Sequence, residues 1–392
     1  MPNPTAPVVA LAADWDTDQT SKHHVMRRVA RYRPVVWVEA TGMRRPSPRR
    51  AGDLRRVLMK LRKIAGRYPR RQPTPDNFTI VSPTTLPFPT SRLAQWINAR
   101  LYARAIRRAL PGNGVAPLLW VYTPTTARFL DQVPHRGLVY HCIDRWWAFD
   151  DYDAAEMRAC HEILCRRADR VFVSARELEQ DCAAFTDRIT YMPHGVDWDH
   201  FRRALEPAQG AQGAEVGDAM PGRRPVVGFI GLMEEWVDVE LMAEIARRHP
   251  EADVVIVGAW RVPSGSLAAL PNVTLTGRRP FASLPDYLRS FDVALIPFHV
   301  NDLTRAVNPL KLREYLSAGV PVVSTALPEL LPFAGAEGVD IAADRETFLT
   351  AVARRLAQPA DRALRLRLSD SMRGEGWDQR VDQMLSTIET PA

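Results

Sequence analysis

The chain contains 392 residues, of which 46% are hydrophobic and 25% are charged, a composition that is ordinary for globular proteins and excludes wholesale disorder. Its length is sufficient for two domains with ample cores, and no apolar run approaches the roughly 20 residues of a membrane span. The formal net charge of +7 is uneven, because residues 44–71 contain twelve arginines and lysines against one acid, Asp53. This imbalance indicates an anionic partner.

The N-terminal segment MPNPTAPVVALAADWD has no basic region before its short apolar run, so we interpret residues 8–12 as a first strand and not as a signal peptide. A polar loop, a helix that contains Val25 and Met26, and a strand at 35–40 complete a βαβ unit. The loop lies at the carboxyl end of the first strand, where open α/β sheets bind ligands. Its D-x-D sequence, Asp14-Trp15-Asp16, has the form of a metal–nucleotide site, but three residues are a weak signal and we expect no metal.

Residues 53–68 show apolar side chains at helical spacing with basic side chains between them. A basic amphipathic helix of this kind is suited to the interface of an anionic membrane, through residues such as Arg55, Arg56, Lys60 and Lys63. The alternative is that its apolar stripe packs onto the first domain. We expect no nucleic-acid partner, because neither an aromatic-interleaved pattern nor a helix-turn-helix pattern accompanies the charge.

Strands and helices alternate through both halves, which predicts an α/β fold with doubly wound parallel sheets. After the first βαβ unit, buried strands are expected at residues 78–81, 118–122, 138–142, 170–174 and 189–192. In the second half they are expected at residues 226–231, 254–258, 273–277, 293–297 and 320–323. The segment between the halves is rich in Ala, Gly, Gln and Pro and is the predicted linker. The expected division is a domain at 1–205, a linker at 206–225, a domain at 226–370 and a C-terminal helix at 371–392.

The four cysteines, Cys142, Cys160, Cys165 and Cys182, show no C-x-x-C spacing of the kind that binds metals. They are typical of reduced, mostly buried thiols in the cytosol. We therefore predict a cytoplasmic protein in which these thiols fill the core.

Residues 301–325, NDLTRAVNPLKLREYLSAGVPVVST, predict a loop, a short helix and a strand. Asn308 is a suitable N-cap, and Pro309 is a suitable first helical residue. Lys311 falls in the first turn, where the helix dipole already places positive charge, so a cation there is unfavourable unless an anion binds beside it. The same positive charge lets helix N-termini bind phosphates. Glu314 lies on the same side of the helix and would accept hydrogen bonds from sugar or ribose hydroxyls. The alternative is a surface ion pair between Lys311 and Glu314.

This stretch resembles the donor site of GT-B glycosyltransferases, particularly the bacterial group that includes family 4. In that group two glutamates separated by seven residues flank a donor-binding turn. Glu314 matches the second glutamate, whereas Ala306 stands in place of the first. The form Asn308-Pro309-x-Lys311-x-x-Glu314 is similar to a sub-branch in which lysine and the cap replace the first acid. Residues 193–197, PHGVD, resemble the signature that closes the first domain of these enzymes, and the resemblance is strongest from about residue 226 to 331.

The resemblance implies a GT-B fold, in which two Rossmann-like, doubly wound parallel-sheet domains face each other across a cleft. The C-terminal domain would bind a nucleoside-diphosphate sugar, the N-terminal domain would bind the acceptor, and the last helix with Trp377 would cross back. Preorganised positive charge would stabilise the departing diphosphate without a metal or another cofactor. The expected donor-binding residues are Gly231, Arg278, Arg305, Asn308, Pro309, Leu310, Lys311 and Glu314.

Asp144 directly follows the strand at 138–142, and its placement resembles the catalytic aspartate of xanthan-type glucuronosyltransferases. We predict that Asp144 and Glu314 are catalytic, with Asp144 as the base for the acceptor hydroxyl if the reaction inverts configuration. If configuration is retained, Asp144 would only position the acceptor. The alternative to either functional role is that Asp144 serves as an N-cap or as a loop acid in an ion pair with Arg145. The other candidates for acceptor binding are His23, His24 and Trp146, for which capping, surface or packing roles are the alternatives.

The combined hypothesis is a metal-independent hexosyl- or glycuronosyltransferase that is peripheral on the inner face of the cell membrane. Its acceptor would be lipid-linked or a glycan, in bacterial envelope or exopolysaccharide synthesis. A nucleotide-sugar epimerase of the same fold and a non-catalytic sugar-nucleotide-binding scaffold are the alternatives. Turnover of nucleotide sugars separates the three, because they predict transfer, isomerisation of the donor, or neither.

Overall fold

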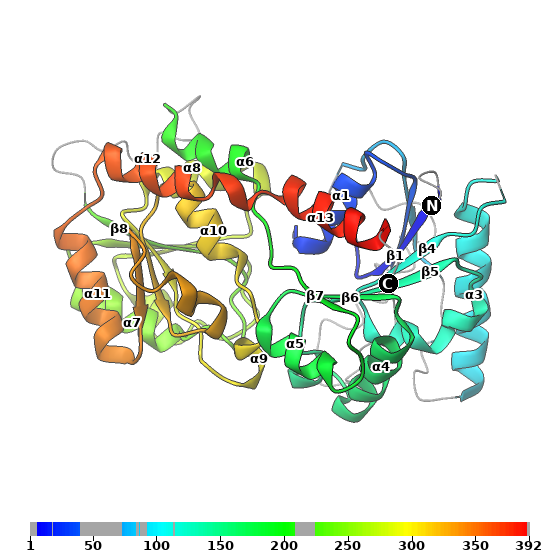
Figure 1. The fold of residues 1–392 in the computed structure, drawn as a ribbon. Helices are drawn as coiled ribbons and strands as arrows, with labels where there is room; N and C mark the ends of the chain where they lie inside the picture. The colour runs from blue at the N-terminus through cyan, green and yellow to red at the C-terminus, as the bar shows by residue number, and fades with distance from the viewer. Residues whose placement is uncertain are drawn as a thin grey trace. The chain divides into compact units, whose positions relative to one another are not determined.

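A computed structural model of the chain describes residues 6–17, 19–39, 73–83, 86, 92–112, 114–207 and 224–389. The chain divides into two compact units of similar size. Unit 1 comprises Met1–Met192 and Val381–Ala392, and unit 2 comprises Pro193–Arg380. Each unit is a parallel sheet covered by helices (Figure 1), and each is described by itself below.

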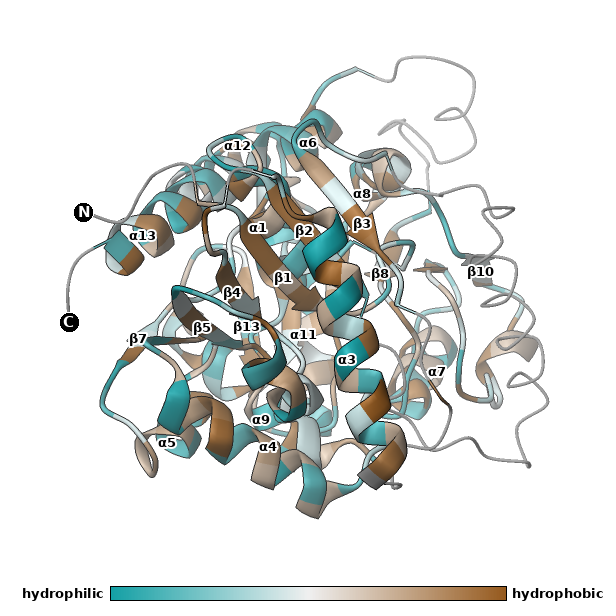
Figure 2. Cartoon of the chain, turned by 90° about the vertical axis from the view of Figure 1, so that its right-hand side faces the viewer, coloured by the Kyte–Doolittle hydropathy of each residue, from teal (hydrophilic) through white to brown (hydrophobic). Residues whose placement is uncertain are grey.

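Unit 1 contains a seven-stranded parallel sheet with the order β3-β2-β1-β4-β5-β6-β7. The strands are β1 (Val8–Ala12), β2 (Val35–Glu39), β3 (Phe78–Val81), β4 (Leu118–Val121), β5 (Gly137–Cys142), β6 (Arg170–Val173) and β7 (Ile189–Tyr191). Strands β1, β2 and β4 are buried along their whole length, and Figure 2 shows the hydrophobic residues that fill them. Such continuous apolar runs are expected where helices cover both faces of a parallel sheet.

The helices of unit 1 connect these strands and alternate with them along the chain. They are α1 (Ser21–Val29), α3 (Arg92–Ala109), α4 (Ala154–Arg167) and α5 (Arg176–Ala183), with 3₁₀ turns η1 (Pro124–Gln132) and η2 (Trp146–Ala148). Asp153 caps α4 by accepting a hydrogen bond from the Glu156 amide. The strand order reverses between β1 and β4, and ligands of open α/β sheets bind at such a reversal.

Unit 2 repeats this arrangement with six parallel strands in the order β10-β9-β8-β11-β12-β13. The strands are β8 (Val226–Ile230), β9 (Asp253–Val257), β10 (Val273–Gly277), β11 (Val293–Ile296), β12 (Val322–Thr325) and β13 (Val339–Ala342). The helices are α6 (Trp198–Arg202), α7 (Val239–Arg248), α8 (Leu284–Ser290), α9 (Asp302–Arg305), α10 (Leu310–Ser317), α11 (Arg345–Ala357) and α12 (Arg362–Ser371). Helix α13 (Trp377–Glu389) starts in unit 2 and continues into unit 1. Short 3₁₀ turns are η3 (Arg203–Leu205), η4 (Leu267–Ala269), η5 (Phe281–Ser283), η6 (Pro328–Phe333) and η7 (Arg373–Glu375). The predicted pair of doubly wound parallel sheets is confirmed.

Unit 2 begins at Pro193, before the predicted domain end at residue 205, because the segment after β7 packs against the second sheet's helices. The ring of Phe201 in α6 lies 5.6 Å from that of Phe281. Gly195 lies so close to Trp377 that a Cβ at this position would be 2.9 Å from the Trp377 backbone. The residues of α13 from Val381 onward belong to unit 1, where Glu389 forms an ion pair of 2.8 Å with Arg33.

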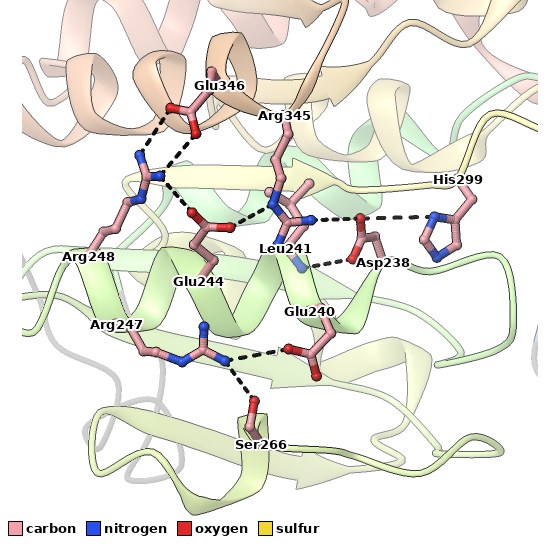
Figure 3. A network of polar contacts seen from close by, with 10 residues as sticks. All are labelled: Asp238, Glu240, Leu241, Glu244, Arg247, Arg248, Ser266, His299, Arg345 and Glu346. Atoms are coloured by element: carbon pink, nitrogen blue, oxygen red, sulfur yellow. Dashed lines mark hydrogen bonds and ion pairs between the residues drawn. The ribbon is translucent and has the colours of Figure 1, made fainter.

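An ion-pair network joins α7 and α11 on the surface of unit 2 (Figure 3). The Arg345 side chain bonds Glu244 at 2.6 Å, and Arg248 bonds both Glu244 and Glu346. Exposed pairs of this kind contribute roughly 0–1 kcal/mol each. The apolar side chains that the two helices bury in the core of unit 2 therefore dominate their packing.

Candidate functional site

The carboxyl ends of three neighbouring strands in unit 2 are occupied by glycines, namely Gly231, Gly258 and Gly277. All three have positive φ angles, and a Cβ at Gly258 would overlap the Gly231 carbonyl group. The Gly231 amide donates to the Val257 carbonyl at 2.8 Å, and the Gly258 amide donates to the Gly277 carbonyl at 3.0 Å. Because none of the three residues carries a side chain of its own, a ligand can approach the backbone closely along this part of the sheet edge.

The side chain of Lys311 lies against Gly231, and a Cβ at this glycine would be 2.8 Å from the Lys311 Nζ atom. The ammonium group also lies 5.7 Å from the Phe229 ring and 5.6 Å from the Phe298 ring. Within the described part of the chain, Lys311 forms no salt bridge and its side chain forms no hydrogen bond. Burial lowers the pKa of Lys311, and the nearby Glu314 carboxylate opposes that shift. A half-buried cation without an acidic partner at bonding distance is suited to an incoming anion.

The carboxylate of Glu314, one turn along α10, is similarly placed. Burial raises its pKa to about 7, and Lys311 opposes the shift. No described residue forms an ion pair or a side-chain hydrogen bond with Glu314, so the predicted alternative of a surface ion pair is wrong. The next residue, Tyr315, holds the helix in place, because its hydroxyl accepts from the Ile230 amide at 2.9 Å and donates to the Ile230 carbonyl at 3.2 Å.

The prediction that Asn308 caps this helix is wrong. Helix α10 begins at Leu310, with Pro309 in the N-cap position. The Asn308 side chain is buried and instead bonds Arg313 at 3.0 Å and Glu329 at 3.1 Å. Because these contacts use both ends of the amide, Asn308 shapes the turn before the helix. Pro309 is buried and Leu310 is half-buried in that turn.

Two arginines predicted to bind the donor lie near the same edge of the sheet. Arg278 directly follows β10, and Arg305 ends α9, whose first turn is capped by Asn301 through Thr304. Both side chains are exposed. Ala306, which stands in place of the family's first glutamate, is fully buried at the end of α9. An acid at this position would have no access to solvent without moving the turn.

In unit 1, Asp144 follows β5 and is half-buried. The predicted alternative of an ion pair with Arg145 is wrong, because Arg145 bonds Asp181 at 2.8 Å and Glu177 at 3.3 Å on α5. Among the described residues, no donor or cation bonds the Asp144 carboxylate. Burial raises the pKa of Asp144, and Lys22 opposes the shift.

Lys22, in the first turn of α1, is the residue that the sequence analysis missed. It is buried, and burial lowers its pKa, with Asp144 opposing the shift. Its ammonium group lies 5.4 Å from the ring centroid of Trp146. Trp146 is also buried, and its indole Nε1–H has no partner among the described residues. A lysine in the first turn of a helix, the signal used for Lys311, would have identified Lys22.

The two histidines of α1, His23 and His24, were predicted to bind the acceptor. His23 Nδ1 accepts from the Thr20 amide at 3.1 Å, and His23 Nε2 lies 3.1 Å from the Trp15 carbonyl oxygen. Because Nδ1 takes part in the helix cap and Nε2 contacts the loop carbonyl of Trp15, neither nitrogen is left for an acceptor. Burial is the main cause that lowers the pKa of His23 to about 4, so the ring stays neutral at pH 7. His24 is buried in the same turn. The four basic residues predicted to contact a membrane, Arg55, Arg56, Lys60 and Lys63, lie outside the described residues.

Comparison with known proteins agrees with the resemblance seen in the sequence. Residues 224–358 match the sequence profile of a family described as Glycosyl transferases group 1. A protein of Bacillus subtilis strain 168 that is named as a teichuronic acid biosynthesis glycosyltransferase, TuaH, is 26% identical over 233 residues. This match covers 55% of the chain and 57% of TuaH, so the chain spans somewhat more than half the length of the curated relative it matches.

Solved structures resemble nearly the whole chain. A sucrose-phosphate synthase from Thermosynechococcus elongatus has a TM-score of 0.72 at 15% identity, with 98% of both chains covered. The Anabaena protein HepE, whose structure is a complex with UDP and glucose, has a TM-score of 0.60 at 13% identity, with 98% of this chain and 99% of HepE covered. At such identities the likeness shows the fold alone. The predicted GT-B fold and the resemblance to GT-B glycosyltransferases are confirmed, the latter by the match of residues 224–358.

Proposed function

We propose that the chain is a glycosyltransferase that moves a sugar from a nucleoside-diphosphate donor to a lipid-linked or glycan acceptor in bacterial envelope or exopolysaccharide synthesis. The observation that carries the proposal is the position of Lys311 against the backbone of Gly231 at the start of α10, where no acid of the described residues lies at ion-pair distance from it. Both residues lie in the segment that matches the glycosyltransferase family.

The donor diphosphate binds at the N-terminus of α10, where the backbone amides and Lys311 provide positive charge. As the bond from the anomeric carbon to the phosphate oxygen breaks, the diphosphate leaves with the electron pair, and Lys311 stabilises the developing charge. Glu314 accepts a hydrogen bond from a hydroxyl of the donor sugar or ribose. Its raised pKa gives it a protonated fraction near neutral pH, in which it also donates a hydrogen bond.

The acceptor binds in unit 1, beside Asp144, Lys22 and Trp146. Its hydroxyl oxygen forms the new bond to the anomeric carbon, and its proton must leave. Asp144 takes this proton if the reaction inverts configuration, and it positions the acceptor if configuration is retained. Burial raises the pKa of Asp144, as a general base requires, and the Lys22 charge partly opposes that shift. Trp146 offers its indole N–H, a donor that has no partner among the described residues.

We further propose that the transferred group is a hexosyl or glycuronosyl unit and that transfer needs no added divalent metal, because Lys311 and the helix N-terminus supply the positive charge. The test is to incubate the full chain with a panel of nucleoside-diphosphate sugars and lipid-linked saccharides, with and without magnesium or manganese. Acceptor-dependent release of the nucleoside diphosphate is the expected result. Isomerisation of the donor without transfer, or binding without turnover, would replace the proposal by an epimerase or a scaffold.

We also propose a cytoplasmic enzyme that associates peripherally with the inner face of the cell membrane. No helix that the structure describes combines the length and the apolar character needed to cross a membrane. In unit 1, one face of α3 exposes Leu93 and Trp96, at 67% and 54%, followed by Arg100 and Arg104. Apolar anchors beside arginines are suited to an anionic lipid surface, as is the basic segment 53–68.

The membrane proposal is tested by sedimentation with anionic and with neutral vesicles at low salt. Each basic side chain near an anionic surface contributes about 1 kcal/mol at most, so we expect binding to anionic vesicles only and its loss at high salt. Replacing Arg55, Arg56, Lys60 and Lys63 by glutamine should release the protein while donor binding is retained. If the wild-type chain ignores anionic vesicles at low salt, the association does not exist.

A further inference from the structure

Four buried side chains from three elements of unit 1 converge beneath the loop that contains Asp144. Cys142 ends β5, His161 and Cys165 lie one turn apart on α4, and Cys182 lies on α5. Each is at most 2% exposed. The fourth cysteine of the chain, Cys160, is also buried on α4, where it lies near Arg128 and Glu156. Spacing in the sequence gave no sign of the cluster, because its members are brought together by the packing of α4 and α5 against the sheet.

Three members of the cluster lie as close together as ligands around one ion, and Cys165 adjoins them through His161. Cys142, His161 and Cys182 each offer one ligand atom, and these atoms lie within 4.8 Å of one another. His161 Nε2 lies 3.5 Å from the Cys165 sulfur and 3.9 Å from the Cys182 sulfur. In tetrahedral zinc sites the bonds are about 2.3 Å to sulfur and about 2.0–2.1 Å to nitrogen. At the tetrahedral angle these bond lengths place a sulfur ligand about 3.5 Å from a nitrogen ligand.

The histidine is oriented for this role by a second contact. Its Nδ1 atom lies 3.0 Å from the Tyr140 hydroxyl, while Nε2 is directed at the sulfurs. With hydrogen on Nδ1 donated to the Tyr140 oxygen, the lone pair of Nε2 is available to a metal. A histidine ligand ordinarily has such a partner for its other nitrogen, which fixes the tautomer. The Trp147 ring packs edge-on against His161 at 4.7 Å and restricts its rotation.

We propose that Cys142, His161, Cys165 and Cys182 bind one zinc ion as a closed, structural site. Three thiolates and a neutral imidazole are the soft ligand set that selects zinc in a tetrahedral geometry. Binding converts the thiols to thiolates and releases their protons to solvent, and the filled site retains one net negative charge. All four positions are taken by protein, so the ion has no place for a substrate and is separate from the transfer chemistry proposed above.

The site would tie the loop after β5 to α4 and α5. The Cys142 sulfur lies 3.9 Å from the Asp144 carbonyl oxygen, and Trp147, which packs on His161, follows in the same loop. On the other side, Arg145 already binds α5 through Asp181. A metal here would therefore fix the backbone on which the Asp144 carboxylate is placed, without touching that carboxylate.

The test uses the full chain, produced with zinc in the medium and purified under reducing conditions without a metal-binding tag. Elemental analysis should find about one zinc per chain, and a mercurial reagent that modifies the thiols should release it. Exchange with cobalt(II) should give the intense visible absorption of a tetrahedral site together with a thiolate charge-transfer band. A metal content below about one tenth of an equivalent, both as purified and after refolding with zinc, would overturn the proposal.

The matched variants are Cys182→Ser, His161→Gln and, as the control, Cys160→Ser. Cys160→Ser removes a buried thiol from the same helix and should leave the zinc content and the cobalt spectrum unchanged. The other two remove a ligand and should lower zinc affinity by more than the roughly tenfold to hundredfold that loss of a ligand's hydrogen-bond partner costs at other sites. Equal zinc content in all three, or a disulfide between Cys142 and Cys182 in the native chain, would contradict the site. If a cluster variant does not fold, the wild-type stoichiometry and cobalt spectrum decide.

Discussion

The two units contain the same combination of charges, a lysine in the first turn of a helix with a carboxylate nearby, but they assemble it in different ways. In unit 2 both groups, Lys311 and Glu314, come from one turn of α10. In unit 1 the lysine is Lys22 of α1, and the carboxylate is Asp144 from the loop after β5. In each pair, burial lowers the pKa of the lysine and raises that of the acid, and the partner opposes the shift.

The difference indicates different tasks for the two pairs. A pair within one helical turn has a fixed geometry, which is suited to a constant ligand such as a diphosphate. A pair that depends on the packing of a loop against a helix can be adapted to another acceptor by changes in the loop. The surroundings also differ, since glycines occupy the ends of three strands in unit 2, one of them beside Lys311, whereas the buried Trp146 ring packs beside Lys22 in unit 1.

The largest effect is expected from removing the charge of Asp144. Asp144→Asn keeps the shape of the side chain and should lower turnover by roughly a hundredfold or more, because proton removal contributes about 10²–10⁴-fold to such reactions. Donor affinity, measured by calorimetry, should stay nearly constant, since Asp144 lies in the other unit. Near-normal turnover in this variant would end the proposed role of Asp144 and, with it, the division of tasks between the two pairs.

The two lysines provide the most direct comparison. Lys311→Ala should weaken binding of a nucleoside diphosphate by roughly 10- to 100-fold, because a charge-assisted hydrogen bond contributes about 1.5–3 kcal/mol. Binding of the nucleoside alone should change much less. Lys22→Ala is the matched control, and it should leave both affinities intact. Equal losses for nucleoside and diphosphate in Lys311→Ala would show that this lysine supports the structure and that the phosphate site lies elsewhere.

A third experiment separates function from stability at Glu314. The pKa of this group is about 7 in the folded chain against an ordinary 4.5, so between these values the folded state holds a proton that the unfolded state has lost. The free energy of unfolding therefore falls as pH rises through this window, by up to about 3 kcal/mol. In Glu314→Gln the side chain does not ionise, so this fall in the free energy of unfolding is absent.

Glu314→Gln should consequently melt at a higher temperature than the wild type at pH 8 and at nearly the same temperature at pH 4. It should also bind the sugar donor less tightly, which is typical of functional groups held in unfavourable surroundings. Glu337→Gln, at an exposed acid paired with Arg367, is the control and should show no such gain. A variant that is less stable at pH 8 would show that Glu314 has a stabilising partner.

The smallest effect is expected at Trp146. Trp146→Phe keeps most of the packing but removes the indole N–H that has no partner among the described residues. A neutral hydrogen bond contributes about 0.5–1.5 kcal/mol, so the KM for the acceptor should rise roughly 2- to 10-fold while donor affinity stays unchanged. An unchanged acceptor KM would assign Trp146 to packing alone, in contact with Phe149 and Tyr152.

The same comparison explains what could be predicted from the sequence. Strand patterns and helix signals are local, so the two sheets and the Lys311–Glu314 pair could be recognised. Lys22 and Asp144 are far apart in the chain and meet only through the fold, so their pairing could not be seen. The cap role of Asn308 was wrong because its amide bonds two buried side chains, Arg313 five residues along and Glu329 twenty-one residues along, and no local pattern indicates these contacts. The cysteine–histidine cluster was hidden for the same reason.

The membership of α13 has a consequence for the order in which the chain can fold. Unit 2 is one continuous segment, whereas unit 1 requires both Met1–Met192 and the residues from Val381 onward. During synthesis, all of unit 2 leaves the ribosome before the last piece of unit 1 exists. Until then Arg33 and Tyr32 lack the partners that Glu389 and Asp382 provide. We expect a chain that ends at Arg380 to retain a cooperative unfolding transition for unit 2 and to lose stability in unit 1, so the final helix acts as the closing step in the maturation of the first unit.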